Sequence, residues 1–211
     1  MNIVLLGLSL IATYLLGAIP TAYIFGRVLK KIDIRQHGSG NVGATNAFRV
    51  LGKGPGTAVL IIDIVKGIIP TTVFANLSGY NDPLMLVLYG LIAVAAHNWT
   101  VFLQFKGGKG IATTLGVLIG FAIQLSWLRI ILLIVLGTWL VFFLISGYVS
   151  LASILAALAL PIAMVVLDAP LPFKIMSIVL CIFIVYRHRS NMKRLFEGKK
   201  KSIAFTGLNL K

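Results

Sequence analysis

The sequence is organised as long apolar runs separated by short polar segments. A helix that crosses the hydrocarbon core of a bilayer needs roughly 20 mainly apolar residues, and the runs that approach this length predict about seven transmembrane helices. The predicted spans are residues 2–25, 57–77, 84–105, 110–127, 128–146, 151–168 and 172–187. The break between the fourth and fifth spans is the weakest, because only Gln124, Ser126 and Arg129 interrupt the apolar run there.

Composition favours an integral membrane protein over a soluble globular one. Of the 211 residues, 59% are hydrophobic and 11% are charged, and the mean hydropathy is +1.00. Soluble domains carry about 25% charged residues. No long linker, low-complexity tract or repeat divides the chain, so we expect one all-α, polytopic membrane domain over residues 1–211. The first apolar run lacks a basic segment before it and is too long for a typical secretory signal.

The positive charges predict an orientation in the membrane. The chain has 19 Lys and Arg residues against 5 Asp and Glu, and all but Lys66, Arg129 and Lys174 lie in three segments on one face of the predicted topology. These basic segments are residues 27–56, 105–110 and 187–211. Such a bias places the N-terminus outside and the C-terminus in the cytoplasm. In a soluble chain a net charge of +14 would suggest nucleic acid, but here it orients the spans and collects anionic substrates, so no nucleic-acid partner is expected.

Residues 37–46, HGSGNVGATN, form a glycine-rich polar loop after the first apolar run. The loop matches the G-x-G-x-x-G dinucleotide fingerprint, which has meaning only between a strand and a helix, so we reject that interpretation. Glycines such as Gly40 and Gly43 let the backbone approach an anion closely. The side chains that could donate hydrogen bonds or charge to that anion are Ser39, Asn41, Thr45, Asn46 and Arg49. A merely flexible turn is the alternative, and it would not need this set of donors.

A second candidate anion site is FKGGKG, residues 105–110, directly before a predicted span. Lys106 and Lys109 supply charge, and the following helix points its positive dipole end toward them. Topology alone would explain the lysines but not the paired Gly107 and Gly108, which favours a binding function. Within the next span Gly116 and Gly120 have the G-x-x-x-G spacing of helix-packing positions.

Charged and titratable residues within the apolar runs are further candidates. Asp63 and Lys66 lie three residues apart, on one helix face, where they either neutralise each other or support a site. His97 is expected deep in the third span. His188 lies between two arginines at the end of the last span, and these cations should keep its imidazole neutral. No Cys cluster, H-E-x-x-H or Ser-His-Asp pattern is present, so neither metal nor triad chemistry is supported.

Taken together, the polar segments resemble those of the acyl-phosphate-dependent glycerol-3-phosphate acyltransferases, the PlsY family. The similarity covers nearly the whole chain, because several motifs occur in order. They are GAIPTAYIFGR at 17–27, GSGNVGATNAFRVLGK at 38–53, FKGGKGIATTLG at 105–116, YVSLAS at 148–153 and YRHRSNMKRLFEG at 186–198. Two departures are notable: where the family usually has Gly-His and a later Pro, this chain has Ala96-His97 and Thr100, and its tail has Lys200 where an acidic residue is common.

The resemblance implies transfer of a fatty acyl group from acyl phosphate to the 1-hydroxyl of glycerol 3-phosphate in the bacterial cytoplasmic membrane. It implies seven spans, an active site facing the cytoplasm, no acyl-CoA, no cofactor and no metal, and it leaves room for a soluble partner that makes the acyl phosphate. It assigns the first loop and Lys109 to the phosphate site. The catalytic positions that it suggests are Lys106, Ser150, His188 and Asn191. The location of Asp63, Lys66 and His97 within apolar runs, and not the resemblance, makes these three residues candidates for supporting roles.

Two other classes of protein remain open from the sequence. A transporter or channel for phosphorylated anions would also carry polar loops and intramembrane charges. Against it, the polar residues gather on one predicted face, and the second half shows no inverted copy of the first. A passive lipid-binding scaffold would not need the donors at Ser39, Arg49, Lys106 and Asn191 together.

Overall fold

The computed structural model describes residues 3–80 and 82–197, and all regular elements in these ranges are helical. The basic tail that contains Lys199, Lys200, Lys201 and Lys211 lies outside the described residues. The helices group into two compact units, Met1–Ser126 and Trp127–Lys211, which are described one at a time. The expectation that both act as a single domain stays a prediction.

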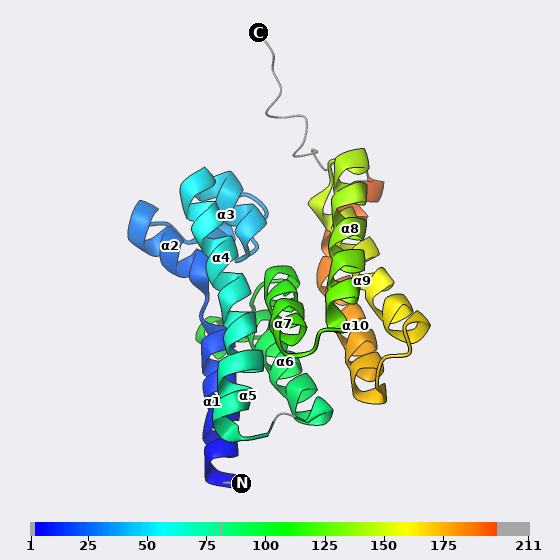
Figure 1. Cartoon of the computed structure of the whole chain (residues 1–211). Helices are drawn as coiled ribbons and strands as arrows, with labels where there is room; N and C mark the ends of the chain where they lie inside the picture. The colour runs from blue at the N-terminus through cyan, green and yellow to red at the C-terminus, as the bar shows by residue number, and fades with distance from the viewer. Residues whose placement is uncertain (1–2, 81, 198–211) are drawn as a thin grey trace. The chain divides into compact units, whose positions relative to one another are not determined.

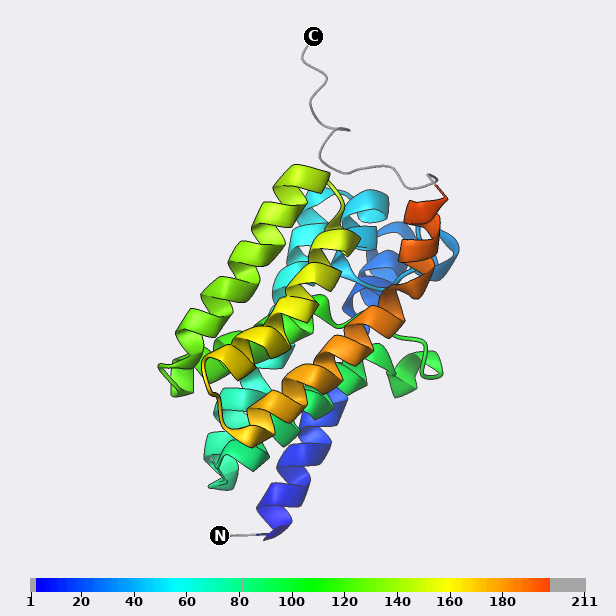
Figure 2. The same ribbon diagram turned by 90° about the vertical axis from the view of Figure 1, so that its right-hand side faces the viewer.

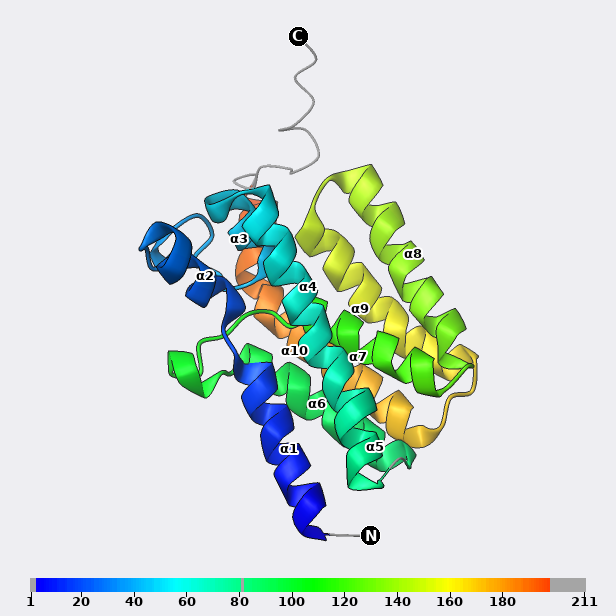
Figure 3. The same cartoon turned by 60° about the vertical axis from the view of Figure 1, so that its left-hand side comes forward.

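The first unit contains α1 to α7 (Figure 1). Its α-helices are α1 (Ile3–Ala18), α2 (Thr21–Lys30), α3 (Ala44–Leu51), α4 (Lys53–Ile69), α5 (Ala75–Ser78), α6 (Pro83–Asn98) and α7 (Ile111–Gln124). Short 3-10 turns, η1 (Ile34–Gln36) and η3 (Val101–Leu103), follow α2 and α6, and a π-helical turn, η2 (Pro70–Phe74), joins α4 to α5. Helix α1 packs against α6, and α4 packs against α7 (Figure 3).

The second unit, as far as residue 197, consists of three long helices, α8 (Leu128–Ser146), α9 (Val149–Val166) and α10 (Leu171–Phe196). Figure 2 shows them as neighbours, with α9 packed against both α8 and α10. Helix α8 keeps most of its apolar side chains exposed, among them Leu133, Leu144 and Ile145. Exposed apolar surface of this extent is expected of a helix whose solvent is lipid.

Hydropathy predicted the apolar helices but not all of their ends. Among residues 3–80 and 82–197, five helices are long and apolar enough to span a membrane, and a sixth is added if α1 and α2 count as one bent span. Helix α7, which corresponds to the predicted span at 110–127, has only 14 residues. The count of seven spans and the orientation of the termini therefore stay predictions.

The span predicted at residues 2–25 is not one continuous helix, because α1 and α2 are separate. The chain bends by 46° between α1 and α2, at Ile19 and Pro20. Proline has no N–H to donate and disfavours helical geometry in the residue before it, so the helix ends there. Within the span predicted at 84–105, the regular α-helix ends at Asn98. His97 therefore lies at the end of this helix and not deep inside it. At the other end of the chain, α10 continues past residue 187 to Phe196, which places His188 inside the helix.

Gly116 and Gly120 confirm the predicted packing motif, because both face α4 and the π-helical turn that follows it. A Cβ atom at Gly116 would meet the carbonyl oxygen of Ile64, and one at Gly120 would meet the hydroxyl of Thr71. Gly67 of α4 packs equally closely against the backbone of α7. The small residues allow the two helix backbones to touch.

Candidate active site

Asn46 shapes the glycine-rich loop from inside. Its side chain is buried, its Oδ1 accepts a hydrogen bond from the Ser39 N–H at 2.8 Å, and its Nδ2 donates to the carbonyls of His37 at 3.0 Å and Ile34 at 3.3 Å. Both amide hydrogens are therefore used within the protein. Asn46 holds the loop closed, whereas the sequence suggested that it would donate to a ligand.

Two glycines are required by the path of this loop. Gly38 and Gly40 have φ values of 62° and 72°, in the left-handed region that favours glycine. A Cβ atom at Gly38 would meet Oδ1 of Asn46, and one at Gly40 would lie 2.9 Å from the carbonyl oxygen of Arg35. The loop is anchored on both sides by the buried side chains of Ile34 and Val42, which belong to one small apolar core.

The remaining candidates of the loop are accessible. Ser39, Asn41 and Thr45 are half-buried, and Gly43 is the N-cap residue of α3. Arg49 is exposed on α3, with its Cδ 3.4 Å from the position of a Cβ at Gly38. Within residues 3–80 and 82–197 the guanidinium of Arg49 forms no hydrogen bond or ion pair. Its N–H donors therefore have no partner in this part of the protein.

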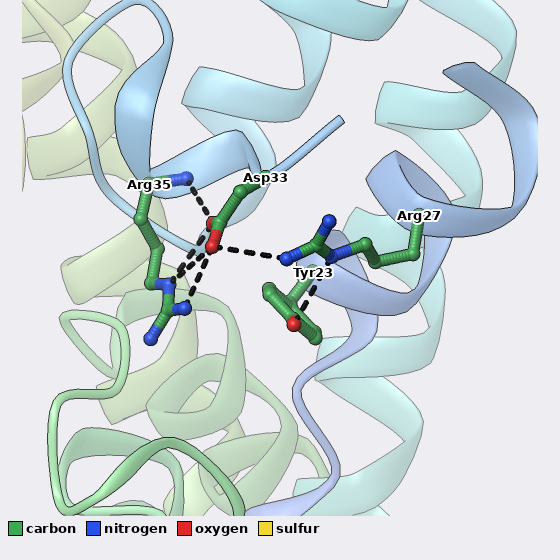
Figure 4. A network of polar contacts seen from close by, with 4 residues as sticks. All are labelled: Tyr23, Arg27, Asp33 and Arg35. Carbon is green, nitrogen blue, oxygen red and sulfur yellow. Dashed lines mark hydrogen bonds and ion pairs between the residues drawn. The ribbon is translucent and has the colours of Figure 1, made fainter. Parts of the chain in front are cut away.

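A carboxylate that the sequence analysis did not single out organises the other arginines of this segment (Figure 4). Asp33 accepts from Arg35 Nη2 at 2.6 Å and from Arg27 Nη2 at 3.3 Å, and both guanidinium groups lie over the ring of Tyr23. The hydrogen bond from the Arg35 side chain is the main reason that the pKa of Asp33 falls from 3.8 to about 2. The same bond raises the pKa of Arg35. The sequence contains one sign that Asp33 pairs with neighbouring arginines: it is the single acidic residue in the segment 27–56, which has six Lys and Arg residues.

The glycine–lysine loop, residues 105–110, packs on the end of α6. The N–H of Gly107 donates to the carbonyl of Asn98 at 3.1 Å, and the N–H of Gly108 donates to the carbonyl of His97 at 3.0 Å. A Cβ atom at Gly107 would meet this same His97 carbonyl, and one at Gly108 would meet the imidazole of His97. The paired glycines thus have a packing reason that the sequence did not reveal.

The two lysines of this loop differ in their surroundings. Lys106 is exposed, and within the described part of the chain its ammonium group forms no ion pair or hydrogen bond. Lys109 is half-buried and, unlike Lys106, takes part in an interaction with another group of the protein. Gly110, with φ 78°, is the N-cap residue of α7, so the loop leads directly into the positive end of that helix dipole.

In the second unit the structure joins two residues that the sequence had proposed separately. Asn191 Nδ2 donates to Ser150 Oγ at 2.6 Å, which links α10 to the first turn of α9. His188 lies one helical turn before Asn191, and its Nδ1 is 2.8 Å from the carbonyl oxygen of Ile184. A carbonyl can only accept, so Nδ1 carries a hydrogen, and in the neutral ring Nε2 is the basic nitrogen. Among the described residues no three His, Cys, Asp or Glu side chains are grouped as a metal site would require.

Together, the apolar helices, their lipid-facing surface and the polar residues at their ends define a polytopic, all-helical integral membrane protein. The sequence profile of the family described as Glycerol-3-phosphate acyltransferase matches residues 7–198. The chain therefore belongs to the glycerol-3-phosphate acyltransferase family, and it is a membrane enzyme of phospholipid synthesis. The resemblance seen in the sequence motifs is confirmed.

Individual relatives agree with this assignment over more than nine-tenths of their length. A glycerol-3-phosphate acyltransferase of Gloeobacter violaceus is 42% identical over 194 residues, which covers 91% of this chain and 92% of the relative. Glycerol-3-phosphate acyltransferase 2 of Moorella thermoacetica is 41% identical, over 93% of this chain and 96% of the relative.

Two solved structures of PlsY, an integral membrane glycerol 3-phosphate acyltransferase, have the same fold. The glycerol 3-phosphate form has a TM-score of 0.81 at 41% identity, and the lysophosphatidic acid form has a TM-score of 0.78 at 40% identity. Each match covers 93% of this chain and 94% of the solved chain.

Proposed function

We propose that the chain transfers a fatty acyl group from acyl phosphate to the 1-hydroxyl of glycerol 3-phosphate. A bond forms between the glycerol oxygen and the acyl carbon, and the anhydride C–O bond breaks. The products are 1-acyl-glycerol 3-phosphate (lysophosphatidic acid) and inorganic phosphate. The observation that carries this proposal is the similarity, over 93% of the chain, to PlsY structures described as glycerol 3-phosphate and lysophosphatidic acid forms.

Binding of the phosphate groups is the first task of such a reaction. Acyl phosphate is an activated mixed anhydride, so the protein needs to position two anionic substrates and stabilise developing charge. We assign this role to the exposed cations Arg49 and Lys106 and to Lys109 at the start of α7. The first loop adds Ser39, Asn41 and Thr45, together with the backbone at Gly40 and Gly43. Asp33 supports the assignment, because it pairs with Arg27 and Arg35 and leaves Arg49 unneutralised.

Removal of the hydroxyl proton is the second task. The proton goes either to the departing phosphate or to Nε2 of His188, which the bond from Nδ1 to Ile184 leaves as the basic nitrogen. We assign to Asn191 the role of orienting a reacting group with its amide, which the hydrogen bond to Ser150 holds in place. None of these steps needs a covalent intermediate, because phosphate is already a good leaving group.

The membrane setting follows from charge and hydropathy. The positive-inside bias of the basic segments supports a cytoplasmic location for the first loop, the glycine–lysine loop and the C-terminal basic segment in a bacterial inner membrane, with the N-terminus outside. The acyl chains of donor and product stay among membrane lipid. A soluble enzyme that makes acyl phosphate would supply the donor.

The test is an assay of the detergent-purified protein with acyl phosphate and glycerol 3-phosphate. Phosphate release that requires both substrates, and that acyl-CoA does not replace, is the expected result. Arg49→Ala should raise KM, whereas Arg129→Ala, which changes another exposed arginine outside the basic segments, should not. Absence of transfer by the wild-type protein, together with anion flux in liposomes, would refute the proposal in favour of a transporter.

A further inference from the structure

Asp63 and Lys66 form a buried ion pair within α4. Lys66 Nζ lies 2.8 Å from Asp63 Oδ1, and the two side chains are only 3% and 2% exposed. Charges removed from water in this way are expensive, and a pair is retained when further hydrogen bonds satisfy it. The other partners of the pair therefore indicate what it does.

The first of these partners belong to the bend between α1 and α2. Lys66 Nζ donates to the carbonyl of Ile19 at 2.9 Å, and Thr21 Oγ1 donates to Asp63 Oδ1 at 3.1 Å. Ile19 follows the last residue of α1, where carbonyls have no partner within the helix. A cation there also matches the negative end of the helix dipole. The ion pair thus ties α4 to the point at which the first apolar run bends.

The next partner belongs to the end of α6. His97 Nδ1 is 3.9 Å from Asp63 Oδ1, and Thr100, two residues after α6, donates from Oγ1 to the carbonyl of Ala18 at 2.5 Å. The carbonyl of His97 accepts from Gly108, and the absence of a side chain at Gly108 leaves room for the His97 imidazole. A continuous chain of contacts therefore runs from the buried pair through His97 to the residue before Lys109.

We propose that Asp63, Lys66 and His97 are positioning residues that hold the glycine–lysine loop in its phosphate-binding geometry. The inference rests on the proposed role of Lys106 and Lys109 in binding phosphate. The three side chains are buried and act through the backbone of His97 and Gly108, so they do not touch the substrate themselves. Any buried acceptor would satisfy Lys66, but the partners used here are the bend after α1 and His97, and His97 contacts the backbone of the glycine–lysine loop.

The experiment separates positioning from simple neutralisation. Lys66→Met and Asp63→Leu each leave one buried charge unpaired, so each should lower Tm. The double variant D63L/K66M removes both charges and should recover most of the lost Tm. Its KM for at least one phosphorylated substrate should stay about 5-fold or more above wild type, with a smaller change in kcat. Recovery of KM together with Tm would overturn the proposal.

A matched control is a buried polar link between α1 and α6. Tyr89 Oη lies 2.5 Å from Ser9 Oγ, and Tyr89→Phe removes this link without touching His97 or the loop. The control should lower Tm and leave KM unchanged. An equal rise in KM for Tyr89→Phe would show that the rise in D63L/K66M comes from general loosening of the packing between α1 and α6. That result would refute the proposal.

A substitute variant and the activity of the wild-type protein separate failure of the positioning role from failure of the proposed function. If D63L/K66M does not fold, the polar neutral pair D63N/K66Q takes its place with the same expected rise in KM. If the wild-type protein releases no phosphate from acyl phosphate and glycerol 3-phosphate, the proposed function fails. An active wild type with unchanged KM in the variants refutes only the positioning role.

Discussion

Asn191 Nδ2 donates a hydrogen bond to Ser150 Oγ at 2.6 Å, which joins two polar residues that are 41 positions apart in the sequence. Ser150 is buried in the first turn of α9, and Asn191 is half-buried on α10. The serine therefore fixes the direction in which the amide of Asn191 can act. If the pair works as a unit, loss of either residue should remove much of the same contribution.

This relationship predicts a non-additive double-mutant cycle. Asn191→Ala should lower kcat by about 10²-fold, the effect of losing one oriented donor in an active site. Ser150→Ala should lower kcat by about 10-fold, because the amide remains but is no longer held. The double variant should be no slower than Asn191→Ala in a phosphate-release assay. Ser153→Ala, which alters a buried serine one turn further along α9, is the control and should leave kcat unchanged. Additive losses would contradict a coupled role.

His188 gives a second prediction about turnover. Because Nδ1 is held by the carbonyl of Ile184, a base role requires Nε2. His188→Ala should lower kcat by about 10²-fold or more, within the range of general-base contributions. His37→Ala, which changes an exposed histidine of the first loop, should stay near wild type. Nearly intact turnover of His188→Ala would leave the departing phosphate as the proton acceptor.

The contact between α4 and α7 predicts an effect on stability. Gly116→Ala would push a methyl group into the carbonyl oxygen of Ile64, and overpacking of this kind costs about 1–3 kcal/mol. We expect Tm to fall by at least about 3 °C in a thermal unfolding assay. Gly137→Ala is matched to it, because Gly137 is also inside an apolar helix, but apart from its own helix backbone nothing lies within 4 Å of an added Cβ there. A similar Tm for both variants would argue against close packing at Gly116.

The sequence predicted which segments are helices better than where they end. Hydropathy located the apolar runs and even the weak break between the predicted spans 110–127 and 128–146; α7 ends at Gln124 and α8 begins at Leu128. It placed the end of the last helix at residue 187, although α10 continues to Phe196. Hydropathy reports which residues suit lipid, whereas a helix ends where its hydrogen bonds end, so a polar helical extension is invisible to it. Pro20 was a local signal for the bend after α1, and the apolar pattern obscured it.

Candidate residues were predictable by type, but their partners were not. Asn46 was recognised as a polar residue of the first loop, yet only the folded chain shows that its amide is used by Ser39, His37 and Ile34. The spacing of Asp63 and Lys66 predicted one helix face. Their bonds to Ile19 and Thr21 depend on the packing of α1 and α2 against α4, which no local pattern encodes.

Asp33 provides a prediction about pH. Its bond to Arg35 lowers the pKa from 3.8 to about 2 in the folded protein, so the stability that it contributes is complete above about pH 4 and is lost as pH falls through 2. Asp33→Asn keeps the acceptor for the Arg35 N–H but removes the charge, and should lower Tm at pH 7 by about 2–4 °C. In thermal scans the difference from wild type should shrink between pH 4 and pH 2. Asp168→Asn, at a fully exposed carboxylate paired with Lys174, should hardly change Tm at any pH, because water screens that pair. A difference for Asp33→Asn that persists at low pH would show that the charge is not its source.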